Sequence, residues 1–261
     1  MNTDQSYLQR YKKFLREYAS RHYYLIINRR IKGERLLGQR SINLLLHILQ
    51  RSRYLSESLA MCFNHKHQSV AYLAVRAHFE VTGMLVYFYN KIKRFYEKDI
   101  TYEEMDVVLR RLTLGGRASA QKLLPSFSKA ISVMDFIDEA DRLFNSMAKE
   151  KKDIYRDRYD YLSEFCHPNN FGLTLGCNIV GWNGRTFAKT QVLEKRDKKE
   201  LIRDFNISSI LFFSIYDKCF EIIKERESKD MPLLFKSFTA FNWALIKFKL
   251  GAKDKAFERA N

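Results

Sequence analysis

Four side chains in this sequence have the types and the spacing that acid–base chemistry requires. Arg76 and Glu80 stand four residues apart, and so do Ser163 and His167, a spacing that places each pair on one face of a helix. An imidazole transfers protons near neutral pH, and a guanidinium can hold an oxyanion with two parallel hydrogen bonds. Arg76, Glu80, Ser163 and His167 are therefore the candidate catalytic residues.

Each pair also has a structural interpretation. Residues 69–89 are apolar nearly all round apart from Arg76 and Glu80, which predicts a central, buried helix. Charges in such a helix need partners, so the two can also form an internal ion pair that locks helix packing. His167 precedes Pro168, and proline disfavours helical geometry in the residue before it, so His167 can simply cap a helix end.

The elements that must position these residues are helices. Apolar residues recur at three-and-four spacing through most of the chain, and the sequence has only three prolines and ten glycines. We predict an all-α helical bundle that forms a single domain over residues 1–261. The predicted helices span about 5–31, 34–63, 68–95, 102–113, 127–150, 153–167, 197–228 and 232–250.

Residues 173–192 depart from this helical pattern. Asn183-Gly184 stands between two β-prone runs, and this dipeptide suits the two positive-φ positions of a type I′ turn. We predict one β-hairpin inserted near 173–192. A lone hairpin is marginally stable in water, so it must pack on the helices or meet a partner.

Positive charge is concentrated near the N-terminus. The chain has a net charge of +16, and the predicted helices of residues 1–53 hold twelve Lys/Arg against three Asp/Glu. The densest group of cations in this region consists of Arg29, Arg30, Lys32, Arg35 and Arg40. Such a group is an electrostatic footprint for phosphates, so these five are the candidate nucleic-acid-binding residues. The alternative is a solvated face that only aids solubility.

Cysteine usage and the N-terminus indicate the compartment. The four cysteines are scattered and include no CxxC pair, which argues against a zinc ribbon and against a disulfide framework. The first residues contain no apolar core of the signal-peptide type. The charges in the middle of 69–89 argue against a membrane span there. We expect a cytoplasmic protein with reduced thiols and no integral membrane span.

Missing motifs argue against several enzyme classes. The sequence has no GxxxxGK[ST], GxGxxG or GxSxG pattern, so an NTPase, a dinucleotide enzyme or an α/β-hydrolase is not expected. Glu164 and His167 form a single E-x-x-H unit, whereas a di-metal helical bundle needs two such units. We expect neither a metal nor another cofactor.

The last thirty residues, 232–261, are aromatic, basic and amphipathic. We predict a C-terminal helix that packs on its own bundle or on a second subunit. The alternative is a helix that lies on a membrane surface.

The segments AVRAHFEVTGMLVYFY and YDYLSEFCHPNNFG together resemble a family of bacterial all-helical proteins. That family combines an R-x-x-x-E helix with a Y-x-x-L-S-x-x-x-H helix and is grouped with HEPN-like proteins. HEPN domains are helical bundles, often dimeric, and many are metal-independent ribonucleases of toxin–antitoxin, abortive-infection and CRISPR systems. The resemblance covers about residues 40–220 and implies that Arg76, Glu80, Ser163 and His167 form the site.

The resemblance also implies a function. His167 has no arginine at the short upstream spacing of catalytic HEPN ribonucleases, so a site would be assembled from Arg76, Glu80 and His167 across helices. We expect an RNA-directed, HEPN-like protein that acts as a metal-independent ribonuclease effector in antiviral defence or a toxin–antitoxin system. Its expected partners are RNA and a second copy or another protein. The alternative is a non-catalytic nucleic-acid-binding or scaffold protein whose polar cluster is structural.

Overall fold

A computed structural model describes residues 3–20, 34–116, 128–148, 154–169, 171–172, 175, 177–179, 187–189 and 195–227. The helices of this part of the chain are α1 (Thr3–Ser20), α2 (Glu34–His65), α3 (Gln68–Tyr96), α4 (Tyr102–Leu114), α6 (Val133–Ala148), α7 (Ile154–Glu164) and α9 (Lys195–Glu227). The strands are β1 (Gly115–Gly116), β2 (Ser128–Lys129), β3 (Cys177–Ile179) and β4 (Phe187–Lys189). The predicted all-α class is confirmed, since the strands are only two or three residues long.

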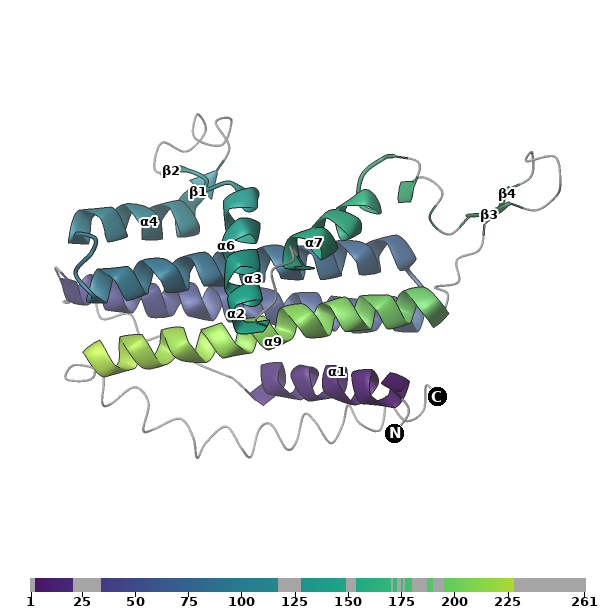
Figure 1. Ribbon diagram of the computed structural model, residues 1–261, viewed down its shortest axis with the longest axis horizontal. Helices are drawn as coiled ribbons and strands as arrows, with labels where there is room; N and C mark the ends of the chain where they lie inside the picture. The colour runs from purple at the N-terminus through teal and green to yellow at the C-terminus, as the bar shows by residue number, and fades with distance from the viewer. Residues whose placement is uncertain are drawn as a thin grey trace.

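α3 is the central helix of the bundle. It packs against α2, α4, α6, α7 and α9, and it runs beside the long helices α2 and α9 (Figure 1). Twelve of its residues are buried, among them Tyr72, Phe79 and Phe88. The prediction that residues 69–89 form a central helix is therefore confirmed. Apolar side chains on most sides of α3 explain why five helices can pack on it.

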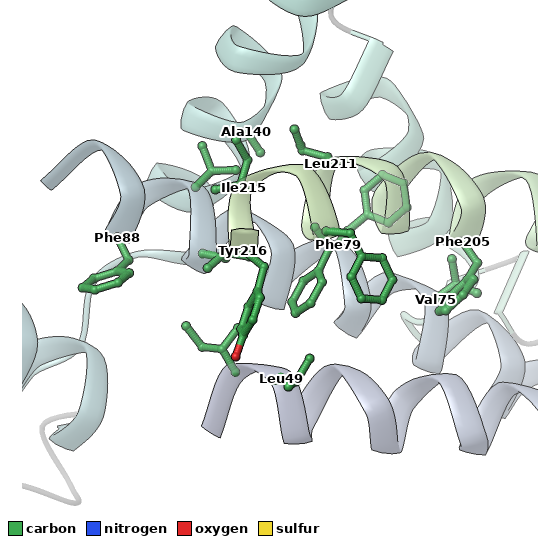
Figure 2. Packing of buried hydrophobic residues seen from close by; sticks show 14 of the residues in the cluster. Leu49, Val75, Phe79, Phe88, Ala140, Phe205, Leu211, Ile215 and Tyr216 are labelled. Carbon is green, nitrogen blue, oxygen red and sulfur yellow. The ribbon is translucent and has the colours of Figure 1, made fainter. Parts of the chain in front are cut away.

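The core lies where α2, α3, α6 and α9 meet. Figure 2 shows Leu49 of α2, Phe79 of α3, Ala140 of α6 and Tyr216 of α9 around one apolar centre. Phe79, Ala140 and Tyr216 expose no surface to solvent. Burying one large apolar side chain stabilises a fold by about 1.5–3 kcal/mol, so this cluster holds the long helices together.

α6 crosses α3 at a close approach. At the crossing α3 carries Gly83, where a Cβ would lie only 2.8 Å from the carbonyl oxygen of Phe136 on α6. Figure 1 shows α6 running steeply across α3. A larger residue at position 83 would push α6 away, and α6 in turn supports the start of α7.

The β3–β4 pair lies in the segment 173–192. The two strands pair antiparallel, with Cys177 opposite Lys189, which confirms the predicted hairpin. Its Asn183-Gly184 turn lies outside the described residues.

The segment predicted as a helix over 127–150 begins differently. Strand β2 pairs in parallel with β1, and α6 begins only at Val133. Arg111 of α4 donates from Nε to the carbonyl oxygen of Lys129 at 3.0 Å, which helps to hold the strand. The predicted start at residue 127 is wrong because a long-range pairing competes with the local helical pattern.

The helices predicted at the two ends of the chain lie partly or wholly outside the described residues. α1 accounts for the first part of the helix predicted over 5–31, and the rest of that prediction lies outside the described residues. The C-terminal segment 232–261, with its predicted helix, lies outside them as well. None of the described helices combines the length and the apolar character that a bilayer crossing requires.

Candidate functional site

Arg76, Glu80 and Tyr159 form one hydrogen-bonded cluster between α3 and α7. The Nη2 atom of Arg76 lies 3.3 Å from Oε1 of Glu80, and it donates to the Tyr159 hydroxyl at 3.2 Å. Tyr159 in turn donates to Oε1 of Glu80 at 3.1 Å. The Arg76 guanidinium also lies over the Tyr159 ring, with 5.4 Å between Cζ and the ring centroid. We call these three residues the open cluster.

Two members of the open cluster, Arg76 and Glu80, are accessible to solvent, whereas Tyr159 is buried. The side chains of Arg76 and Glu80 are 23% and 30% exposed, even though α3 is the central helix. Both charged side chains are therefore only partly covered, although α3 itself is the central helix. Partial exposure means that a ligand can reach the guanidinium, which a sealed ion pair would not allow.

The pKa values of Arg76, of Tyr159 and of the neighbouring Cys166 are shifted. Burial lowers the pKa of Arg76, but the Tyr159 hydroxyl and the Glu80 carboxylate more than offset it, so the pKa lies above its ordinary value. Burial raises the pKa of Tyr159, so its hydroxyl keeps the proton that it donates. Burial also raises the pKa of the nearby Cys166 thiol, and Arg76 opposes that rise. At neutral pH the Arg76 cation therefore lies beside a protonated Tyr159 hydroxyl and a protonated Cys166 thiol.

One donor of Arg76 is unused. Its Nε–H is buried and finds no hydrogen-bond partner among the described residues. A buried donor without a partner costs about 1–3 kcal/mol, so such a group in a native structure calls for an explanation. A purely structural ion pair would gain by saturating the guanidinium. Because Nε is buried, a ligand can reach only the exposed part of the guanidinium and not this donor.

Ser163 and His167 lie where α7 ends. The helix ends at Glu164, three residues before its predicted end, but the backbone N–H of His167 still donates to the Ser163 carbonyl at 3.2 Å. The Ser163 hydroxyl donates to the Tyr159 carbonyl at 2.8 Å, along its own helix. The side chain of His167 is exposed. Ser163 thus bonds within α7, while the imidazole is open to solvent.

Asn169 and Gly172 build the turn that follows His167. Asn169 donates from Nδ2 to Glu164 at 2.6 Å, and its side-chain oxygen accepts from the Gly172 N–H at 2.9 Å. A Cβ on Gly172 would collide with the carbonyl oxygen of His167. Glycine is therefore required at position 172, and this turn fixes the backbone that presents His167.

α7 connects the two predicted pairs. Tyr159 stands on the same helical stripe as Ser163 and His167, about two turns before the histidine. Cys166, the neighbour of His167, interacts electrostatically with Arg76. The residue that joins the pairs, Tyr159, was missed as a site residue, although its place on the stripe was a usable signal. That the His167 ring itself lies within about 6 Å of the Arg76–Glu80 pair stays a prediction.

Asp141 of α6 caps the N-terminus of α7. Its Oδ1 accepts hydrogen bonds from the backbone N–H groups of Tyr155 at 2.8 Å and of Arg156 at 3.0 Å. A carboxylate in this place satisfies free donors and complements the helix dipole. The capping residue lies on another helix, so no local sequence pattern predicts it.

Arg158 and Tyr161 hold α7 against α9. Arg158 donates from Nε to Oδ1 of Asp204 at 2.9 Å and from Nη2 to Oδ2. Tyr161 donates to Glu200 at 3.1 Å, and its ring lies 4.5 Å from the Arg158 Cζ. Burial raises the pKa of Asp204, and the Arg158 guanidinium opposes that rise. Sequence reasoning missed this ion pair; the available signal was an aspartate on the apolar face of a long predicted helix.

A second polar cluster is fully enclosed. His78 of α3 lies between Ser52 of α2, 2.7 Å from Nε2, and Ser208 of α9, 2.8 Å from Nδ1. Thr82 and Tyr155 also contact the Ser208 hydroxyl, at 2.9 and 3.4 Å. None of these five residues exposes any surface, and we call them the sealed cluster. Burial lowers the pKa of His78 to about 3, so its imidazole is neutral, with one nitrogen donating and the other accepting.

The predicted nucleic-acid-binding residues are only partly visible. Arg29, Arg30 and Lys32 lie outside the described residues, and Arg35 belongs to the first turn of α2. Arg40 forms an ion pair with Asp106 of α4. Its charge is therefore already paired, and it connects α2 to α4.

Within the described part of the chain, no three His, Cys, Asp or Glu side chains gather as a metal site would require. Cys62, Cys166 and Cys219 are free thiols. No protein-family model, no curated protein and no solved structure matches the chain. The site has to be interpreted from its own geometry.

Proposed function

We propose that this chain is an RNA-directed, HEPN-like protein that cleaves RNA without a metal, and that the open cluster and His167 form its reactive site. One observation carries the proposal. Arg76 is held by Glu80 and Tyr159, yet its side chain is 23% exposed, beside the helix end that presents an exposed histidine. An effector role in antiviral defence or a toxin–antitoxin system is the context that the HEPN resemblance implies.

The proposed reaction uses the 2′-hydroxyl of RNA as the nucleophile. The 2′-oxygen forms a new bond to phosphorus, and the bond from phosphorus to the 5′-oxygen breaks. The proton lost by the 2′-hydroxyl is balanced by the proton gained by the 5′-oxygen, so the products carry a 2′,3′-cyclic phosphate and a 5′-hydroxyl. His167 serves in proton transfer, and Arg76 holds the phosphate oxygens as negative charge develops.

The other two members of the open cluster position the arginine. Tyr159 and Glu80 contact the Nη2 side of the guanidinium, at 3.2 and 3.3 Å, which fixes the plane of the fork. The Arg76 side chain is already held in one rotamer, so it loses less conformational freedom when its guanidinium binds an anion. The net charge of +16 adds long-range attraction for RNA.

Purified protein incubated with mixed RNAs, with and without EDTA, tests this proposal. We expect cleavage that survives EDTA and leaves 2′,3′-cyclic phosphate ends. His167→Ala should lower the cleavage rate by about 10²–10⁴-fold, because a general acid/base is lost. The variant should stay folded, since a histidine at a helix end contributes only about 0.3–2 kcal/mol.

His47→Ala is the matched control, because His47 is also exposed but lies on α2. It should cleave at the wild-type rate. Wild-type protein that leaves every RNA intact, or cleavage that EDTA abolishes, contradicts the proposal. Equal loss in the two histidine variants contradicts the role of His167.

A second function is favoured by a different observation. Arg76, Glu80 and Tyr159 already bond to one another and join α3 to α7, as a structural polar cluster would. Under this interpretation the protein binds nucleic acid or acts as a scaffold without catalysis. Removing the cluster should then lower the free energy of unfolding by about 1–3 kcal/mol, with no RNA cleaved by the wild type.

A further inference from the structure

A groove runs between α1 and α9, away from the open cluster. It is open to solvent and has a volume of about 750 Å³, and its lining comes from one stripe of α1 together with Ile210 and Phe213 of α9. In Figure 1 α1 lies below the long helices α2, α3 and α9, whereas α7 lies above them. The groove is therefore a second candidate site, separate from the reactive one.

Aromatic packing sets the orientation of α1 along this groove. Phe14 of α1 stacks on Phe213 of α9, with ring centroids 5.7 Å apart and planes 13° apart. Tyr11 packs edge-on against Phe205, with ring centroids 5.3 Å apart. Both side chains of α1 are buried, so the helix cannot rotate without losing apolar contact.

This orientation places three cations along the rim of the groove. Arg10, Lys13 and Arg16 are spaced three residues apart, so they follow one side of the helix, and all three are exposed. The described residues that line the groove include no carboxylate. At a rise of about 1.5 Å per residue the three charges span about 9 Å.

These cations differ from most arginines of the bundle. Arg53, Arg158 and Arg40 each have a carboxylate partner within the fold. No ion pair within the described part of the chain engages Arg10, Lys13 or Arg16. Unpaired cations along a hollow raise the local positive potential, so the groove selects an anionic occupant.

The flanking segments of the chain do not have that charge. Residues 21–33 hold four Lys/Arg and no Asp/Glu, and residues 228–261 hold seven Lys/Arg against three Asp/Glu. Like charges repel, so neither segment complements the rim. The occupant is therefore expected to be a separate anionic molecule.

We propose that the α1–α9 groove binds the phosphate backbone of single-stranded RNA and anchors the substrate away from the reactive site. This inference rests on the proposed RNA-directed function. The three cations follow one another along the groove on long, flexible side chains, so they can contact successive phosphates of a single strand. Ile210, which is 41% exposed, offers apolar contact to the sugar or base edges.

The test measures binding of a fluorescein-labelled, unstructured single-stranded RNA by anisotropy over a range of salt concentrations. All proteins are full-length and carry His167→Ala, so that the RNA stays intact. The groove variant carries Arg10→Gln, Lys13→Gln and Arg16→Gln. Each lost phosphate contact on a single strand reduces the slope of log K against log salt by about 0.7, so the groove variant should lose about 2 from the slope.

A charge-matched control separates a local site from general attraction. Lys218→Gln, Lys224→Gln and Arg226→Gln remove the same charge from exposed positions of α9 that do not line the groove. The control should keep the wild-type slope, and circular dichroism should show all variants folded. In proteins that retain His167, the groove variant should raise KM and leave kcat unchanged, because an anchor contributes equally to ground-state and transition-state binding.

The outcomes distinguish the two proposals. If the protein with an intact groove binds no RNA at low salt, the RNA-directed function fails, and this inference fails with it. If that protein binds RNA and the groove variant has the same slope, only the groove assignment is overturned. If a polyglutamate peptide binds the protein with an intact groove, while the groove variant no longer binds this peptide but still binds RNA, the occupant is an acidic protein segment.

Discussion

Two polar clusters on the same helix have opposite environments. Arg76 and Glu80 of the open cluster and His78 and Thr82 of the sealed cluster are interleaved along α3. The Arg76 side chain is 23% exposed, whereas His78 exposes no surface. Residues two apart on a helix point about 200° apart, so the two clusters face different sides of α3.

The difference shows how burial assigns a role to a polar side chain. In the sealed cluster neighbouring hydroxyls satisfy both nitrogens of His78, and the histidine is held neutral. In the open cluster Arg76 stays charged and is partly exposed. A satisfied, enclosed network specifies packing, whereas a charged and partly exposed group can meet a ligand.

The largest expected effect comes from breaking the open cluster at its arginine. Arg76→Gln should lower RNA cleavage by about 10²–10³-fold, the typical loss when one oxyanion-stabilising donor is removed. The free energy of unfolding should fall by only about 1 kcal/mol, because the pair is partly exposed. Cleavage rates and urea unfolding of the same preparation measure both quantities.

Arg53→Gln is the control for that variant. Arg53 pairs with Glu57 on α2 at 3.0 Å, with the same spacing and a similar exposed fraction, 25%. It should leave the cleavage rate unchanged. Arg76→Gln could instead lose much more stability than Arg53→Gln, with cleavage falling only in proportion to the folded fraction. That result would show that the open cluster stabilises the fold and takes no part in cleavage.

The sealed cluster should make stability depend on pH. Burial lowers the pKa of His78 to about 3, below its unfolded value of about 6.5, so its contribution is fully present above pH 6.5 and is lost as the pH falls toward 3. In that window the unfolded chain binds one more proton, and the free energy of unfolding should fall by about 1.4 kcal/mol per pH unit. Urea unfolding between pH 7 and pH 4.5, the wild type compared with His78→Asn, measures this slope.

His47→Asn is the control for the pH series, because it removes an exposed histidine from α2 without touching the sealed cluster. In His47→Asn the free energy of unfolding should change with pH as steeply as in the wild type. In His78→Asn this dependence should be smaller by about 1.4 kcal/mol per pH unit. Identical slopes in all three proteins would show that His78 is not held neutral by burial.

The smallest effect comes from two tyrosines one turn apart on α7. Tyr155 donates to the Phe79 carbonyl at 3.1 Å inside the sealed cluster, whereas Tyr159 donates to Glu80 in the open cluster. Tyr155→Phe should lower the free energy of unfolding by about 1–3 kcal/mol, because buried partners are left unsatisfied. Tyr159→Phe should lower it by less than about 1 kcal/mol, because its partners Arg76 and Glu80 are partly exposed and water can solvate them in its place. Equal losses in urea unfolding would remove the distinction between the clusters.

Much of the fold could be predicted because its signals are local. The period of apolar residues predicted α2, α3, α4 and α9 to within a few residues of their ends. The Asn-Gly dipeptide predicted the β3–β4 hairpin. The start of α6 could not be predicted, because β2 owes its conformation to pairing with β1, which lies beyond the reach of a local helical pattern.

The site could be predicted only in outline. Arg76 and Glu80 are paired as their spacing predicted. Tyr159 stands four residues before Ser163, on the same helical face, but nothing local showed that it would bridge Arg76 and Glu80. Asp141 and Asp204, which cap and anchor α7, come from other helices and have no partner near them in sequence.

The sequence by itself determined which segments are helical and which residues share a helical face, because helix periodicity depends on neighbours a few residues away. It also determined the turn after α7, where Asn169 and Gly172 act on residues within one short loop. The tertiary structure alone decided that Arg76 meets Tyr159 and stays partly exposed, while His78 is enclosed by α2 and α9. Burial depends on which helices cover each side of α3, and that is settled by packing over the whole chain and not by any local pattern.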